Sequence, residues 1–135
     1  MNWNRVLLAA LVGGIANNLV NFLLHGVVLS GTYAEYPEVF VQGESNPLFF
    51  LLVALFAAVI LAILFARTRQ CWASGAKGGL FFGALAGALV GTTYFFDPLT
   101  IEGFPYYLAW CSFTIEILGY AAEGRVMAVF IKRES

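Results

Sequence analysis

Apolar residues dominate four long stretches of the chain, which short polar segments separate. The stretches cover residues 6–29, 47–66, 76–96 and 105–131. A helix needs about 20 apolar residues to cross the hydrocarbon core of a bilayer, which is about 30 Å thick. The pattern therefore predicts an all-α membrane protein, in which four transmembrane helices form one antiparallel bundle and a single domain over residues 1–135.

Local signals indicate where these helices begin. Pro47 suits a first helical turn, and Asn46 before it is a favoured N-cap residue. The first stretch begins after Arg5 in the manner of a signal peptide, but its apolar character continues to Leu29. This length exceeds the apolar core of a signal peptide, so we expect a helix that is retained.

Charged residues indicate the orientation of the helices. The seven basic residues lie before the first stretch, between the second and third, and toward the end of the fourth: Arg5, Arg67, Arg69, Lys77, Arg125, Lys132 and Arg133. Residues 31–46 and 97–104 contain acidic residues and no Lys or Arg. Because Lys and Arg concentrate in cytoplasmic loops, both termini are expected on the cytoplasmic side of a bacterial inner membrane.

The composition agrees with a lipid solvent. The chain is 61% apolar and 11% charged, whereas an average soluble domain is about 45–50% apolar and about 25% charged. These values exclude an ordinary soluble enzyme and make the lipid bilayer the first expected partner. The net charge of −1 provides no excess of positive charge for binding nucleic acid.

The third stretch carries a glycine at every fourth position. The row consists of Gly75, Gly79, Gly83, Gly87 and Gly91. Helices in lipid associate where small residues let their backbones approach, and a four-residue spacing follows one ridge of a helix. The row predicts a tight helix-packing contact, either with the first or fourth helix of the same chain or with another subunit.

Polar side chains on the first and fourth helices form a predicted intramembrane polar cluster. Its members are Asn17, Asn18, Asn21, His25, Ser112 and Glu116. At the α-helical rise, Glu116 lies about 16 Å and Asn17 about 18 Å from the outer boundary, so both fall near the midplane. A carboxyl group there costs a few kcal/mol and needs a partner, and Asn17 or Asn21 is at matching depth. Glu123 is expected near the inner boundary instead.

Two interpretations of Glu116 stay open. Ionisable residues within membranes are functional candidates by default. Alternatively, a protonated Glu116 that forms a hydrogen bond with an asparagine would hold the first and fourth helices together. The asparagines themselves are more simply explained by packing, because amide hydrogen bonds between membrane helices are common.

His25 lies closer to the outer edge, and three roles are open for it. It could form a hydrogen bond at the interface, relay protons to Glu116, or act as an axial ligand to a haem or a chlorophyll-type pigment. A bis-histidine haem would need a second histidine from another chain, because this sequence has one. Apart from that possibility we expect no cofactor, and no residue pattern indicates a metal site.

Residues 17–26 have the sequence NNLVNFLLHG and lead into an outer segment rich in aromatic and acidic residues. In this segment and in its expected topology, the chain resembles small bacterial four-helix integral membrane proteins of uncharacterised function. The resemblance implies the same arrangement in the membrane and no activity that can be transferred.

The sequence contains no Walker loop and no GxSxG, HExxH or CxxC pattern, so we expect no enzyme activity and no catalytic residues. The first hypothesis is a non-catalytic integral membrane subunit or interaction protein, whose partners are other membrane subunits or copies of the same chain. The alternative is an oligomeric proton-linked transporter or channel that uses Glu116. The second alternative is haem or pigment binding through His25.

Overall fold

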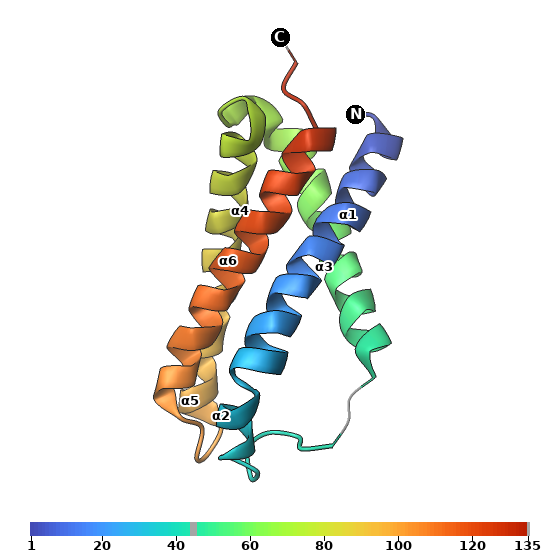
Figure 1. Cartoon of the computed structure of the whole chain (residues 1–135). Helices are drawn as coiled ribbons and strands as arrows, with labels where there is room; N and C mark the ends of the chain where they lie inside the picture. The colour runs from blue at the N-terminus through green and yellow to red at the C-terminus, as the bar shows by residue number, and fades with distance from the viewer. Residues whose placement is uncertain (44–45, 135) are drawn as a thin grey trace.

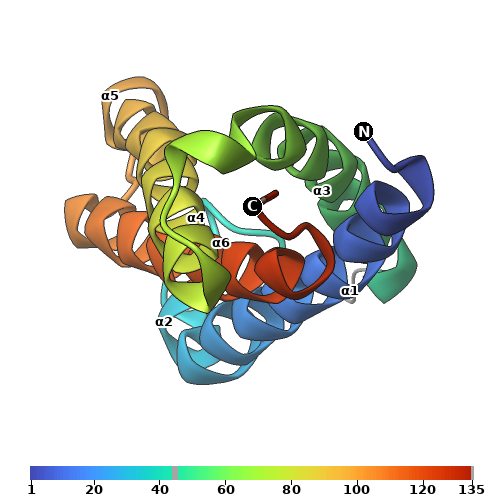
Figure 2. The same cartoon turned by 90° about the horizontal axis from the view of Figure 1, so that it is seen from above.

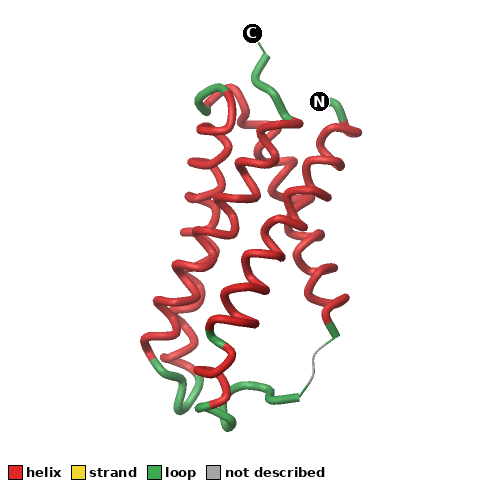
Figure 3. The backbone as a smooth tube through the Cα atoms, in the orientation of Figure 1, coloured by secondary structure: helices red, strands yellow, loops and turns green. Residues whose placement is uncertain are grey.

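The computed structural model describes residues 1–43 and 46–134, and these residues form helices and loops without a strand. In chain order the elements are α1 (Trp3–Asn21), the π-helical η1 (Phe22–Val28), α2 (Ser30–Ala34), α3 (Pro47–Thr68), the 3-10 turn η2 (Arg69–Cys71), α4 (Gly75–Thr92), the 3-10 turn η3 (Thr93–Phe96), α5 (Asp97–Thr100) and α6 (Tyr106–Phe130). Figure 3 shows that loops occur mainly at the ends of the long helices. The predicted all-helical class is confirmed for the described residues.

The limits of the long helices are close to those predicted. α3 begins at Pro47, and the Asn46 side chain caps it by accepting a hydrogen bond from the Leu48 backbone N–H at 3.0 Å. α1 and η1 together form one helical segment that ends at Val28. The π-helical form of η1, which is wider than an α-helix, is a feature that the apolar pattern did not indicate.

Four long helices pack against one another in the order α3, α1, α6 and α4 (Figure 1, Figure 2). Both chain termini lie at one end, which we call the N/C end, and α2 and α5 lie at the opposite end, which we call the loop end (Figure 1). α6 occupies the central place because it packs against α4 on one side and against α1 on the other. Side chains of α6 can therefore contact two neighbouring helices.

The hydrophobic core lies toward the N/C end, where all four long helices meet. Phe65 of α3 packs against Phe82 of α4, with ring centroids 4.8 Å apart. Small and branched side chains complete this core, namely Val6, Ala9, Ala10, Ala58, Leu61, Ala62, Met127, Ala128 and Ile131. The core joins the beginning and the end of the chain, and it holds α3 beside α4 at this end.

α3 has fully buried side chains in only one half of its length. Its buried residues are Ala58, Leu61, Ala62 and Phe65, all in the half toward the N/C end. Residues 47–57 carry no buried side chain, and Phe56 is 73% exposed. Exposed apolar surface of this kind is unfavourable in water, whereas lipid chains can cover it.

Among the residues that the structure describes, three helical segments are long and apolar enough to cross a membrane, namely Trp3–Val28, Pro47–Cys71 and Gly75–Thr100. α6 has 25 residues but is not one of these segments, and it carries Glu116, Glu123 and Arg125. Apolar helices of this length are compatible with an integral membrane protein.

Candidate functional site

α4 and α6 contact each other backbone to backbone. A Cβ atom at Gly79, Gly83 or Gly87 would overlap a carbonyl oxygen of α6. A Cβ atom at Gly91 would lie 2.9 Å from the ring of Phe113. Any larger residue at these positions of α4 would push the two helices apart. The structure thus places this row of glycines against the fourth long helix of the same chain.

Gly75, which was predicted to belong to the same row, lies outside this contact. It is the first residue of α4, its φ is +69°, and no atom lies within 4 Å of an added Cβ. Its glycine character serves the left-handed backbone at the start of the helix. The row also has a counterpart that the spacing in α4 did not reveal, because a Cβ at Gly124 of α6 would overlap the Gly79 carbonyl oxygen.

α1 and α6 are joined by polar side chains instead. The Asn17 amide Nδ2 donates a hydrogen bond to Glu123 Oε2 at 2.6 Å, and both side chains are buried. Asn21 donates from its own amide to Asn17 Oδ1 at 2.7 Å. Gly119 of α6 leaves the room for these amides, because a Cβ at this position would overlap Asn17 Oδ1. The two asparagines and Glu123 therefore form a connected group across the α1–α6 contact.

This pairing corrects the prediction that Asn17 or Asn21 would donate to Glu116, because Asn17 donates to Glu123 and Asn21 donates to Asn17. The prediction matched depths by counting inward from the outer ends of the two helices. Packing sets the register instead, because a Cβ at Gly13 of α1 would contact Met127 and Glu123 of α6 at 3.1 and 3.2 Å. Asn17 therefore lies beside Glu123, which is 1% exposed.

One oxygen of Glu123 stands out among the residues that the structure describes. Its Oε1 is the buried side-chain atom of this part of the chain that has no hydrogen-bond partner. A buried polar atom without a partner costs about 1–3 kcal/mol, and more when it carries charge. Glu123 therefore has a hydrogen-bond partner at Oε2, which is Asn17, and none at Oε1 among the described residues.

Glu116 is buried two helical turns away on the same face of α6, because positions seven apart lie on one side of a helix. Its Oε1 accepts a hydrogen bond from the Tyr94 hydroxyl of η3 at 3.3 Å. Ser112, one turn further toward the loop end, is also buried. Tyr94 was missed at the sequence level, because nothing in the sequence shows that residues 94 and 116 lie side by side.

No family model matches this chain, and neither a curated protein nor a solved structure is significantly similar to it. Among the residues that the structure describes, no group of three or more His, Cys, Asp or Glu side chains could hold a metal ion. The structure of this chain, with its buried polar residues and its exposed apolar surface, is therefore the main basis for a functional proposal.

His25 lies in η1 and is separate from the Asn17–Glu123 group. Its Nδ1 forms a hydrogen bond with the hydroxyl of Tyr33 in α2, and the two rings stack with centroids 5.9 Å apart. Burial raises the pKa of Tyr33 to about 12, so this phenol keeps its proton at neutral pH. Asn18, the remaining member of the predicted cluster, is half-buried.

The arrangement on α6 has two chemical capacities. Its carboxyl groups bind neighbouring helices, since Glu116 accepts a hydrogen bond from Tyr94 and Glu123 accepts one from Asn17. Each carboxyl group can also take up or release a proton within the helix group. The first capacity is structural, and the second would allow proton-linked transport.

Proposed function

We propose that the chain is an integral protein of a bacterial inner membrane, in which α1 with η1, α3, α4 and α6 all span the bilayer as an antiparallel bundle. The central position of α6 supports the fourth span, because its two buried carboxyl groups are shielded from lipid. Large apolar side chains such as Leu118 and Val129 occupy its exposed surface. The seven basic residues favour cytoplasmic termini.

Within that membrane, we propose that the protein is a non-catalytic subunit or interaction protein. The observation that carries this proposal is the half of α3 nearest the loop end, where residues 47–57 contain no buried side chain. η1, which follows α1 at the same end, also has no buried residue. A helix of a partner, either another membrane subunit or a second copy of the chain, would give this half of α3 the packing that its other half already has.

Site-specific photocrosslinking in native membranes tests this proposal. A photoreactive phenylalanine analogue at Phe56, which is 73% exposed on α3, is expected to form an adduct with a protein. The matched control is the same analogue at Leu89, which is 74% exposed on α4 and faces lipid in this account. A protein adduct at Phe56 and none at Leu89 would support the proposal. Adducts with lipid alone at both positions would contradict it.

The second candidate function, an oligomeric proton-linked transporter or channel, is favoured by a different observation. Glu123 is buried, and its Oε1 has no partner among the described residues. A purely structural carboxyl group would be expected to use both oxygens, because an unsatisfied buried acceptor is costly. Glu123 therefore joins Glu116 as a candidate group for taking up and releasing protons within the bundle.

Proton flux into proteoliposomes that carry a pH-sensitive dye tests this second candidate. Glu123→Gln is expected to abolish flux while the protein stays folded, because glutamine keeps the acceptor for Asn17 but does not titrate. Glu134→Gln, an exposed substitution beyond the end of α6, is the matched control and should leave the flux unchanged. Equal flux in the wild type and in Glu123→Gln would reject a proton-linked role for this residue.

A further inference from the structure

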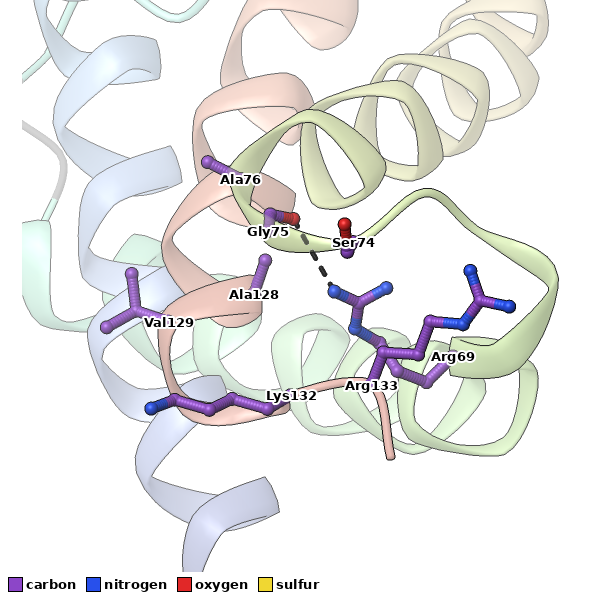
Figure 4. Close-up of a pocket in the computed structure, with 8 residues that line it drawn as sticks. All are labelled: Arg69, Ser74, Gly75, Ala76, Ala128, Val129, Lys132 and Arg133. Carbon is purple, nitrogen blue, oxygen red and sulfur yellow. Dashed lines mark hydrogen bonds between the residues drawn. The ribbon is translucent and has the colours of Figure 1, made fainter. Parts of the chain in front are cut away.

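A pocket of about 410 Å³ opens at the N/C end, between the beginning of α4 and the end of α6. Three basic residues line it, namely Arg69, Lys132 and Arg133, together with residues 74–76 (Figure 4). Its remaining wall is apolar and belongs to Ala128 and Val129 of α6. Neither the packing of the helices nor the buried carboxyl groups of α6 account for this basic pocket.

The first turn of α4 faces this pocket without a capping side chain. Ser74 is the N-cap residue and its side chain makes no capping hydrogen bond, and the first turn contains no acidic residue. Gly75 has no atom within 4 Å of an added Cβ, so space is open beside the backbone at this point. The N-terminus of an 18-residue helix carries partial positive charge and free N–H groups, which favour an anion.

Arg69 provides the second observation, because its charged side chain is buried beside the pocket. It is 3% exposed, and its guanidinium donates to the carbonyl oxygens of Ile131 at 2.8 Å and Ala73 at 2.9 Å. Its third acceptor is the Gly75 carbonyl at 3.5 Å, which Figure 4 marks with a dashed line. All of these partners are neutral carbonyl groups. A buried cation without a negative partner is unfavourable, so an anion in the pocket would complete its environment.

The other two basic residues add positive charge, and among the residues that the structure describes no acidic side chain pairs with them. Arg133 donates from Nε to the Gln70 side-chain oxygen at 3.2 Å. Lys132 extends along α6 away from the guanidinium of Arg69 in Figure 4, and its flexible side chain can rotate toward the pocket. Basic residues on the cytoplasmic side are common in membrane proteins, but that tendency does not explain why Arg69 is buried beside a pocket.

The position of the pocket indicates where its anion comes from. The candidate span of α3 ends at Cys71 and that of α4 begins at Gly75, so the pocket lies at the boundary of the proposed membrane segment. Phosphate groups of lipids lie at this depth, and basic pockets on the cytoplasmic side bind anionic headgroups. The apolar wall at Ala128 and Val129 is suited to the first carbons of an acyl chain.

We infer that this pocket binds the phosphate of an anionic phospholipid from the cytoplasmic leaflet. The beginning of α4 and the buried Arg69 supply the fixed positive end of the site, and Lys132 and Arg133 supply mobile charges at its rim. The inference rests on the proposed insertion in the membrane, and it is independent of any partner protein and of proton transport.

The test is lipid binding by the purified full chain in nanodiscs of phosphatidylcholine with and without phosphatidylglycerol. Native mass spectrometry should show retained phosphatidylglycerol, and the thermal unfolding temperature should rise when this lipid is present. The double variant Lys132→Gln with Arg133→Gln should lose about tenfold or more in phosphatidylglycerol retention. Both residues are exposed, and unfolding in pure phosphatidylcholine checks that the variant keeps the fold.

The matched control is Arg67→Gln with Arg125→Gln, which removes the same charge from two exposed residues outside the pocket lining. A smaller loss in this control supports a specific site, whereas equal losses would show general surface attraction and overturn the inference. Inorganic phosphate added in detergent is the second arm. If it stabilises the protein as well as phosphatidylglycerol does, the lipid assignment is overturned. A chain that fails to enter nanodiscs would instead contradict the proposed membrane insertion.

Discussion

α6 makes its two main contacts with opposite chemistry. Toward α4, glycines bring backbone against backbone, and carbonyl oxygens of α6 lie where the Cβ atoms of larger residues would be. Toward α1, the contact depends on the amide of Asn17 and the carboxyl group of Glu123. Lipid provides no hydrophobic force between helices, so close packing and hydrogen bonds are the available means of association. α6 uses close packing toward α4 and hydrogen bonding toward α1.

The two sides should respond differently to substitution. The glycine side tolerates no added volume, because its carbonyl oxygens belong to a rigid helix. The polar side tolerates a change of charge when hydrogen bonding is preserved, because its partners are side chains. Substitutions on the glycine side should therefore cause the larger losses of stability. On the polar side, the loss should depend on whether the substitution preserves hydrogen bonding.

The largest effect is expected on the glycine side, from Gly83→Leu. A Cβ at this position already overlaps the Tyr120 carbonyl oxygen, so the variant should lose more than about 2 kcal/mol of unfolding free energy or fail to assemble. Unfolding in mixed detergent micelles measures this. Leu85→Phe, at a position 60% exposed on the same helix, is the control and should stay close to the wild type. Similar and mild losses in both variants would contradict the steric contact.

A double-mutant cycle of Asn17→Ala and Glu123→Ala measures the polar side. The short buried hydrogen bond should give a coupling free energy of about 1–2 kcal/mol, at the upper end of the values for membrane helices. The same cycle with Glu116→Ala in place of Glu123→Ala is the control and should give a coupling close to zero. The opposite ranking would restore the pairing that was predicted from the sequence.

These two contacts differ in how far the sequence could predict them. The four-residue spacing of Gly79, Gly83 and Gly87 is a local pattern, so it identified a packing ridge before its partner was known. The pairing of Asn17 with Glu123 depends on how far one helix is shifted along another. That shift is set by Gly13 and Gly119, and it cannot be counted from the helix ends.

Other contacts could not be predicted from the sequence for similar reasons. The contact of Tyr94 with Glu116 needs the α4–α6 pair to be assembled first. Arg69 was interpreted only as a charge that marks the cytoplasmic side, because no pattern shows that its guanidinium would reach the Ile131 carbonyl at the end of α6. By contrast, the start of α3 at Asn46 and Pro47 was predictable, since capping depends on neighbouring residues alone.

A smaller effect is expected from the hydrogen bond that Tyr94, in η3 after α4, donates to Glu116. Tyr94→Phe removes a donor at 3.3 Å and should cost about 0.5–1 kcal/mol of unfolding free energy. This loss should be smaller than that of Gly83→Leu, because the glycines carry most of the α4–α6 contact. A loss from Tyr94→Phe that exceeds the loss from Gly83→Leu would show that hydrogen bonding dominates on both sides of α6.

The last prediction concerns pH dependence at the loop end, where Tyr33 contacts His25. The pKa of Tyr33 is raised from its ordinary value of 10.0 to about 12, so folding favours the protonated phenol. Its contribution to stability should be complete below pH 10 and should be lost as the pH rises from 10 to about 12. The difference between the ultraviolet titration curves of the wild type and Tyr33→Phe isolates this group. A midpoint near pH 10 in that difference would show that Tyr33 is solvated.

The central claim is that α6 crosses the membrane between α1 and α4, with both of its carboxyl groups inside the bundle. Alkaline phosphatase fused after Gly103 or after Glu134 tests it most directly, because the enzyme is active only outside the cytoplasm. Relative to the amount of fusion protein, activity is expected to be high after Gly103 and low after Glu134. Equal activities at the two positions would mean that α6 does not cross the membrane and would contradict the account.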